Sequence, residues 1–302
     1  MKPYHIKSIR ELHMLLEIPK PRHPLISVID FSAIKCFDDP SLESVTYGFY
    51  CISRKKNFKG QMRYGQQHYD FDDGIMNFFM PGQIIVTEIR DDWNLEGLWL
   101  VIHPYFIQGF ALAADIRKFG YFSYAVNEAL HLSHDEEQMI TALLIEIAKE
   151  SQAATDVFSQ PILIKQIELL LSYCDRFYHR QFLTRKQGGN NFLAVFEGLL
   201  DDYFNTPEKQ VNGLPNVSYF ADRMNLSPNY LSDMLRNITG RSAQIHIQQK
   251  LIDKAKELLS VTDLSVSEVA YRLGFEYPQS FSKLFKNKTQ KTPGEYRASF
   301  NQ

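Results

Sequence analysis

The sequence predicts an α+β protein, with a small β-barrel and helices in its N-terminal part and only helices in its C-terminal part. Three observations support this prediction. Short apolar and aromatic segments separated by turn residues run from about residue 25 to 103, helical periodicity takes over near residue 104, and residues 217–287 contain one helical pattern twice. A chain of 302 residues is long enough for two domains.

The N-terminal strands are predicted from β-branched and aromatic residues, which favour a pleated, half-buried surface. Turn residues at 72–74, 81–82 and 91–92 separate the segments. The expected strands are 25–29, 46–52, 58–64, 75–80, 84–87 and 98–102. Short strands at this spacing are typical of a small barrel or sandwich. The aromatic side chains of Tyr47, Phe49 and Tyr50 would either line a ligand pocket or fill the barrel interior.

Amphipathic helices follow the strands. Ser133 and Glu136 have the spacing of a capping box and predict a helix start. Pro161 opens a second helix, and a third helix ends near Phe204. The second helix carries an apolar stripe that is either intramolecular core or a dimer seam, formed by Ile164, Ile167, Leu170, Leu171, Cys174 and Phe177.

A linker rich in proline and glycine is predicted at 206–215, and it divides the chain into domains 1–205 and 206–302. The two parts differ in charge. The C-terminal domain holds 13 Lys/Arg against 9 Asp/Glu, whereas the N-terminal domain holds 20 against 26, within a net charge of −2. A basic part beside an acidic part is expected when only one of them meets phosphate groups.

A repeat in the C-terminal domain gives the most specific information. Residues 217–237 recur as 266–287. In each copy a short amphipathic helix ends at a residue that tolerates a positive φ angle, Asn225 or Gly274, and a second helix begins at a proline. Two helices joined by such a tight turn form the helix-turn-helix arrangement of DNA-binding proteins.

Other classes of protein lack support in the sequence. The chain has no apolar run of membrane-spanning length and no N-terminal signal peptide, and its three cysteines lack metal-ligand spacing, so we expect a cytoplasmic protein. His68 and His103 are far apart, and no His-x-His pair occurs within 25–103. A glycine-rich phosphate loop and a nucleophile elbow are also missing. We therefore expect no catalytic residue, no metal, no cofactor and no enzyme activity.

The C-terminal domain resembles the AraC/XylS family of bacterial transcription regulators. The matching segments are LSPNYLS (226–232), Thr239-Gly240, AKELL (255–259), SEVAYRLGF (267–275), FSKLFK (281–286) and TPGEYR (292–297). The resemblance implies a seven-helix DNA-binding unit with two helix-turn-helix motifs joined by a central helix at about 242–259. Residues 1–205 are similar to the cupin-type sensing domain of family members at 67–71, 81–82, 122–124 and 127–130.

Polar side chains share one face of each proline-started helix, opposite the apolar face. Asn and Gln suit adenine, Lys suits guanine or phosphate, and Ser suits either. Together with the resemblance, this pattern predicts that DNA is bound by Ser227, Asn229, Tyr230, Ser232, Asp233, Arg236, Pro278, Gln279, Ser282, Lys283 and Lys286. A solvated polar face with no ligand is the alternative reading of the same pattern.

Three positions depart from the family pattern. Asp233 stands where a polar or basic residue is common, and its carboxylate would repel phosphate but accept a hydrogen bond from the cytosine amino group. Gln290 replaces a usual glycine, and Leu235 replaces a common phenylalanine. The base preference of the first motif is therefore the least defined feature of the resemblance.

The resemblance implies a sequence-specific transcription regulator that binds double-stranded DNA and responds to a small-molecule effector of unidentified class. RNA polymerase and a second copy of the chain are further candidate partners, and no membrane partner is expected. The alternative functions are a cupin-type metalloenzyme and an interaction module whose helical tail does not bind DNA.

Overall fold

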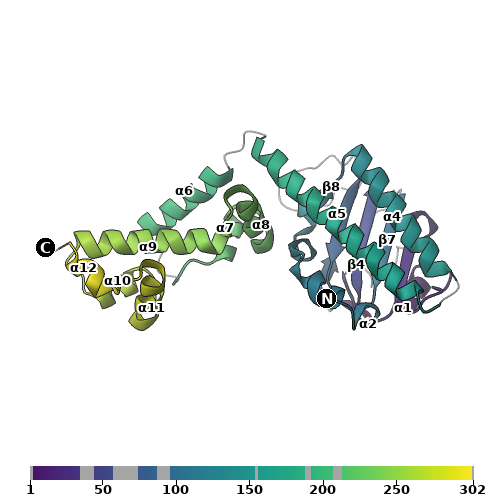
Figure 1. The fold of residues 1–302 in the computed structure, drawn as a ribbon, viewed down its shortest axis with the longest axis horizontal. Helices are drawn as coiled ribbons and strands as arrows, with labels where there is room; N and C mark the ends of the chain where they lie inside the picture. The colour runs from purple at the N-terminus through teal and green to yellow at the C-terminus, as the bar shows by residue number, and fades with distance from the viewer. Residues whose placement is uncertain are drawn as a thin grey trace. The chain divides into compact units, whose positions relative to one another are not determined.

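The computed structural model describes residues 3–34, 44–56, 74–86, 96–153, 156–187, 192–206 and 213–300 (Figure 1). The chain forms two compact units, Met1–Gln181 and Phe182–Gln302. The strand expected at 58–64, the turns at 72–73 and 91–92, the segment 67–71, and the residues Cys36 and His68 lie outside the described residues. In the described part of the chain, no helix is long and apolar enough to span a membrane.

The strands of the first unit form two sheets with a shared apolar core. One sheet has the order β1-β3-β6 and the other has the order β2-β7-β4-β5-β8. Their bounds are β1 Tyr4–Ile6, β2 Ile26–Asp30, β3 Ser44–Tyr47, β4 Tyr50–Lys56, β5 Ile75–Phe79, β6 Ile84–Val86, β7 Glu96–Ile102 and β8 Leu130–His131. Side chains from both sheets, among them Val45 and Val101, meet in one buried cluster. The described strands do not close into a single ring.

A strand predicted as continuous at 46–52 is divided between the two sheets. β3 ends at Tyr47 and β4 begins at Tyr50. Between them the Gly48 N–H donates to the Ile6 carbonyl at 2.8 Å, and a Cβ at Gly48 would lie 3.0 Å from the Lys7 carbonyl oxygen. Glycine therefore fits this close crossing, where the chain leaves one sheet for the other.

Aromatic residues near this crossing fill the core. Phe49 is fully buried, Tyr50 is almost so, and Tyr47 packs its ring against Phe49 and Trp99. Burial strongly raises the pKa of the Tyr47 hydroxyl, which therefore stays neutral. Of the two roles open for these side chains, the structure supports filling of the interior.

Helices cover one face of the five-stranded sheet, as Figure 1 shows for α4 (His134–Gln152) and α5 (Ser159–Gln187). The predicted capping box is confirmed, because the Glu136 N–H donates to Ser133 Oγ and the Ser133 N–H donates to the Glu136 carboxylate. Shorter helices are α1 (Ile9–Leu15), α2 (Pro104–Ile107) and α3 (Leu112–Asp115).

The apolar stripe of α5 belongs to the core of the chain. All six of its residues are at most 5% exposed, from Ile164 to Phe177. The Tyr121 hydroxyl donates to the Leu171 carbonyl at 3.0 Å, which holds the segment after α3 against this helix. Of the two roles left open by the sequence, the structure therefore supports intramolecular core rather than a dimer seam.

The second unit is entirely helical in its described residues. It contains α6 (Phe192–Asn205), α7 (Val217–Arg223), α8 (Pro228–Thr239), α9 (Ala243–Val261), α10 (Val266–Arg272), α11 (Pro278–Thr289) and α12 (Pro293–Ala298). The α7–α8 pair lies at one end of α9, and α10 to α12 lie at the other end (Figure 1). The central helix expected at about 242–259 is confirmed.

Helix α6 packs into this second unit, although the sequence assigned it to the first domain. Phe196, Leu200, Tyr203 and Phe204 are buried in the same cluster as side chains of α7 and α9. The Tyr203 hydroxyl also donates to the Gly213 carbonyl at 2.7 Å. The unit boundary therefore lies before α6 and not at 205/206.

Candidate DNA-binding surface

The two helix-turn-helix motifs have the same backbone geometry in their turns. Asn225 and Gly274 both adopt positive φ angles, 54° and 89°. The N–H of the next residue then donates to the carbonyl of the alanine in the first helix, from Leu226 to Ala221 at 2.9 Å and from Phe275 to Ala270 at 3.0 Å. The repeat in the sequence thus corresponds to a repeat in structure.

Several residues in the segments that carry the family resemblance have structural roles. Glu268 and Glu295 complete capping boxes that start α10 and α12. The Arg297 Nε donates to the Leu259 carbonyl at 3.1 Å, so α12 is fastened to the end of α9. These contacts hold the second motif on the central helix.

Most of the predicted DNA-binding side chains lie on one accessible face of α8 or α11. Asn229, Arg236, Gln279, Lys283 and Lys286 are exposed, and Ser232, Asp233 and Ser282 are half-buried. The opposite faces are buried, with Leu231 and Leu235 in α8 and Phe281 and Phe285 in α11. Each helix therefore offers its polar face while its apolar face holds it in the unit.

Three predicted contact residues have different environments. Tyr230 is fully buried, and its ring packs edge-on against Phe182 at 5.1 Å between centroids, so its side chain takes part in packing and not in the accessible face. Ser227 caps α8 by accepting the Tyr230 N–H at 3.2 Å. Pro278 is the half-buried first residue of α11. Ser227 and Pro278 can approach DNA only at the helix starts.

The two accessible faces differ in charge. In α8 the Arg236 guanidinium forms an ion pair with Asp233, one turn away. In α11 the charged residues are Lys283, Lys286 and Lys288, and all three are exposed. The first face is therefore neutral in sum, whereas the second is cationic.

The structure also brings exposed residues to these motifs that the sequence did not single out. Tyr277, directly before α11, is 59% exposed and does not cap the helix with its side chain. Lys288 in the last turn of α11 is also exposed, but it lies seven residues after the buried Phe281 and therefore away from the face of Lys283 and Lys286. The alignment of Tyr277 with Ser227 could have drawn attention to this position, because a serine cap is replaced there by an aromatic ring.

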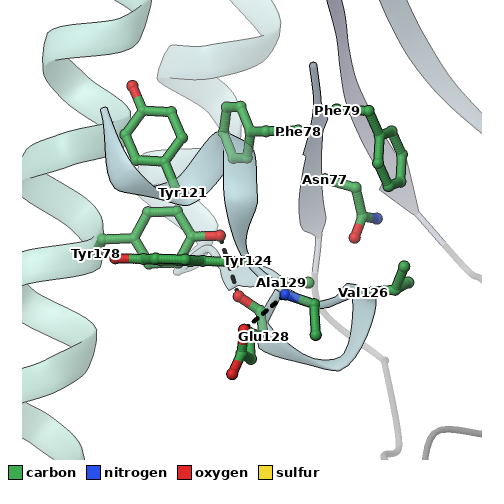
Figure 2. Close-up of a pocket in the computed structure, with 10 residues that line it drawn as sticks. Asn77, Phe78, Phe79, Tyr121, Tyr124, Val126, Glu128, Ala129 and Tyr178 are labelled. Carbon is green, nitrogen blue, oxygen red and sulfur yellow. Dashed lines mark hydrogen bonds between the residues drawn. The ribbon is translucent and has the colours of Figure 1, made fainter. Parts of the chain in front are cut away.

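The first unit contains a small hollow at the edge of β5, shown in Figure 2. Its volume of about 10 Å³ corresponds to one water molecule. Phe78 and Tyr121 lie on one side of the strand, and Asn77 and Phe79 lie on the other (Figure 2). Among the described residues, the buried Asn77 Nδ2 has no hydrogen-bond partner. A larger ligand would fit here only if the walls moved.

The wall of this hollow includes a segment that the sequence compared with sensing domains. The Glu128 side chain accepts the Ala125 N–H at 2.6 Å, and the Tyr178 hydroxyl donates to the Glu128 carbonyl at 3.1 Å. The segment is therefore fixed both to itself and to α5. Burial raises the pKa of the neighbouring Tyr121 hydroxyl, which therefore stays protonated.

Metal ligation has no support in the described part of the chain, where no three His, Cys, Asp or Glu residues come together. His103 caps α2 by accepting the Tyr105 N–H at Nδ1, at 3.2 Å. Burial lowers the pKa of the imidazole. His103 thus has a structural role in the start of a helix.

Comparisons with known proteins agree with the geometry of the second unit. Residues 220–299 match the family model described as a helix-turn-helix domain. The HTH-type transcriptional regulator YijO of Escherichia coli, itself uncharacterized, is 31% identical over 132 residues, which are 44% of each chain. The transcriptional activator RhaS of E. coli O1:K1 is 27% identical over 168 residues, covering 55% of this chain and 56% of that one.

A solved structure is also similar to part of the chain in sequence. The C-terminal domain of the response regulator yesN from Fusobacterium nucleatum is 30% identical, with a TM-score of 0.32, and covers 36% of this chain and 99% of that one. The first three curated relatives are each matched over less than half of their own length.

The fold and the accessible faces of α8 and α11 define a DNA-binding helix-turn-helix domain. The two curated relatives compared above are both named as transcription regulators of the helix-turn-helix type.

Proposed function

We propose that the protein is a sequence-specific DNA-binding transcription regulator. The observation that carries the proposal is the presence of two matching helix-turn-helix motifs on one helical unit, each with an accessible polar helix face. Because α9 joins the motifs, α8 and α11 would enter successive major-groove segments, about 34 Å apart on one face of the duplex.

The contact residues proposed for the first motif are Asn229, Ser232, Asp233 and Arg236, and those for the second are Gln279, Ser282, Lys283 and Lys286. Asn229 and Gln279 can bind adenine through two hydrogen bonds each, and Lys283 can bind guanine or phosphate. Losing a base contact would cost about 1–3 kcal/mol and relax the preference at one position of the site. Losing a phosphate contact would weaken binding to all sequences alike.

The test is a selection of binding sites from random DNA with the full chain, followed by affinity measurements at several salt concentrations. We expect a defined site and an affinity that falls steeply with salt. Gln279→Ala and Lys283→Ala should relax the preference in one half of the site, whereas Lys149→Gln, which removes an exposed charge in the first unit, should not. Failure to select any sequence, or binding that does not depend on salt, would refute the proposal.

The first unit is proposed to sense a small-molecule effector and to assemble the regulator, as a homodimer and in contact with RNA polymerase. Support comes from the similarity of its sequence to cupin-type sensing domains. An effector can alter DNA occupancy only by binding one state of the protein more tightly than another. Screening ligands by thermal shift and then measuring DNA affinity with each ligand tests this; a stabilising ligand that leaves DNA affinity unchanged would argue against it.

A further inference from the structure

The two recognition helices differ in charge although they match in geometry. Arg236 and Lys286 occupy equivalent positions, and their carbonyls accept equivalent hydrogen bonds from Gly240 and Gln290, both at 2.8 Å. Arg236 is paired with Asp233 on its own helix, whereas the residue at the position equivalent to Asp233 is Lys283. The exchange of an acidic residue, Asp233, for a basic one, Lys283, at this equivalent position therefore makes the face of α8 neutral and the face of α11 cationic.

The helices next to them do not cancel this difference. The partner helix α7 carries Asp222 and Arg223, and α10 carries Glu268 and Arg272, so each adds no net charge. Within the described residues, no ion pair joins a lysine of α11 to a carboxylate. Hydrogen bonds with Thr292 are the main cause of the lowered pKa of the nearby Glu295, and the charges of Lys286 and Lys291 lower it further.

We propose that the two motifs divide DNA binding unequally: α11 supplies most of the attraction to phosphates in addition to its base contacts, whereas α8 selects bases with little net charge, including a preference for cytosine at Asp233. The inference rests on the proposed function, because it assigns different tasks to the two halves of that surface. The paired Asp233 would repel a phosphate that Arg236 approaches, so the pair as a whole gains little from the charged backbone. The same carboxylate can accept a hydrogen bond from the cytosine N4 amino group.

A matched pair of charge deletions tests the division. Arg236→Gln and Lys286→Gln remove one positive charge from equivalent, exposed positions of the two motifs. The slope of log affinity against log salt should become shallower by about 0.9 for Lys286→Gln, as expected for one lost phosphate contact, and should change little for Arg236→Gln. Equal changes for the two variants would overturn the proposal.

Asp233→Asn provides the complementary test, because it leaves Arg236 without its ion-pair partner. We expect a steeper salt dependence, by about 0.9, and at least a roughly 10-fold loss of discrimination at one base pair of the selected site. If the variant selects the same base preferences as the wild type, Asp233 does not take part in base selection. Thermal melting of each variant, followed by circular dichroism, checks that the fold is retained.

The wild-type measurement separates this inference from the proposed function. If the full chain binds no DNA in a salt-dependent manner, the proposed function fails and the division of tasks fails with it. If the wild type binds a defined site but Arg236→Gln and Lys286→Gln behave alike, only the division of tasks fails.

Discussion

Gly240 and Gln290 occupy the same backbone position at the ends of α8 and α11. Both are left-handed, with φ angles of 76° and 61°, and both donate their N–H to the carbonyl four residues earlier. A side chain in this conformation costs about 1 kcal/mol relative to glycine. The second motif therefore carries strain at a point where the first does not.

Replacement of Gln290 by glycine should relieve this strain. We expect Gln290→Gly to raise the free energy of unfolding by about 0.5–1 kcal/mol, after allowance for the lost hydrogen bond from Gln290 Nε2 to the Asn287 carbonyl. The reciprocal variant Gly240→Gln should lower it by a similar amount. Urea denaturation of the full chain, followed by circular dichroism, measures both; shifts of equal sign would contradict the explanation.

The turn of the second motif should not tolerate a side chain. A Cβ at Gly274 would lie 2.6 Å from the Gly213 carbonyl oxygen, which is backbone and cannot rotate away. Gly274→Ala should therefore destabilise the second unit by about 2–3 kcal/mol. Asn225→Gly at the equivalent turn is the control and should be neutral or slightly stabilising. A Gly274→Ala melting curve that matches the wild type would show that this contact is absent in solution.

A fragment that begins at the linker should fold poorly. Starting at residue 206 removes α6 and with it four buried core side chains, among them Phe196 and Tyr203. Each such side chain contributes about 1.5–3 kcal/mol, and small domains have only about 5–15 kcal/mol in total. We expect fragment 182–302 to melt cooperatively and fragment 206–302 to lack a cooperative transition. Equal melting curves would show that α6 is dispensable.

The loss of folding stability at acidic pH should depend in part on His246. Burial, with the positive charge of Arg241, lowers the pKa of its imidazole against the opposing effect of Glu197. Because the folded state binds this proton less tightly than the unfolded chain, the contribution is present above the unfolded pKa of about 6.5 and is lost as pH falls below it. His246→Gln should therefore lose less stability than wild type between about pH 7.5 and 5. Parallel profiles would exclude His246 as a cause.

Placing a carboxylate at either of two nearby positions of α5 should affect stability very differently. Ile167 is fully buried, whereas Leu169 is 45% exposed. Ile167→Asp places a carboxylate in the core and should cost several kcal/mol, on the order of 4. Leu169→Asp should change the unfolding midpoint little. Sedimentation of Leu169→Asp and wild type in parallel separates any loss of self-association from loss of fold.

Features fixed by short stretches of sequence were predictable. The helix starts at Pro228 and Pro278 and the turns at Asn225 and Gly274 follow from local backbone preferences, and the structure has them where the sequence placed them. The candidate contact faces follow from the same helical period. The uniform composition of residues 46–52 predicts a single strand, and only the close approach of Gly48 to Ile6 and Lys7, far away in the sequence, divides it.

Features that depend on distant partners were not predictable from the pattern. The sequence pattern of an amphipathic helix such as α6 predicts that one face is buried, but it does not show which unit covers that face. Tyr230 is polar enough for the accessible face, yet its neighbours bury it completely. The Asp233–Arg236 pair required side-chain placement, because a spacing of three residues permits contact on a helix without enforcing it.

The approach of Gly213 to Gly274 has a mechanical consequence. The last residues of the linker touch the turn of the second motif before the chain enters the first motif at Val217. The same Gly213 carbonyl accepts a hydrogen bond from the hydroxyl of Tyr203 in α6. Because one carbonyl oxygen meets both α6 and this turn, a displacement of α6 within the second unit would reach the second motif directly, without passing through the first.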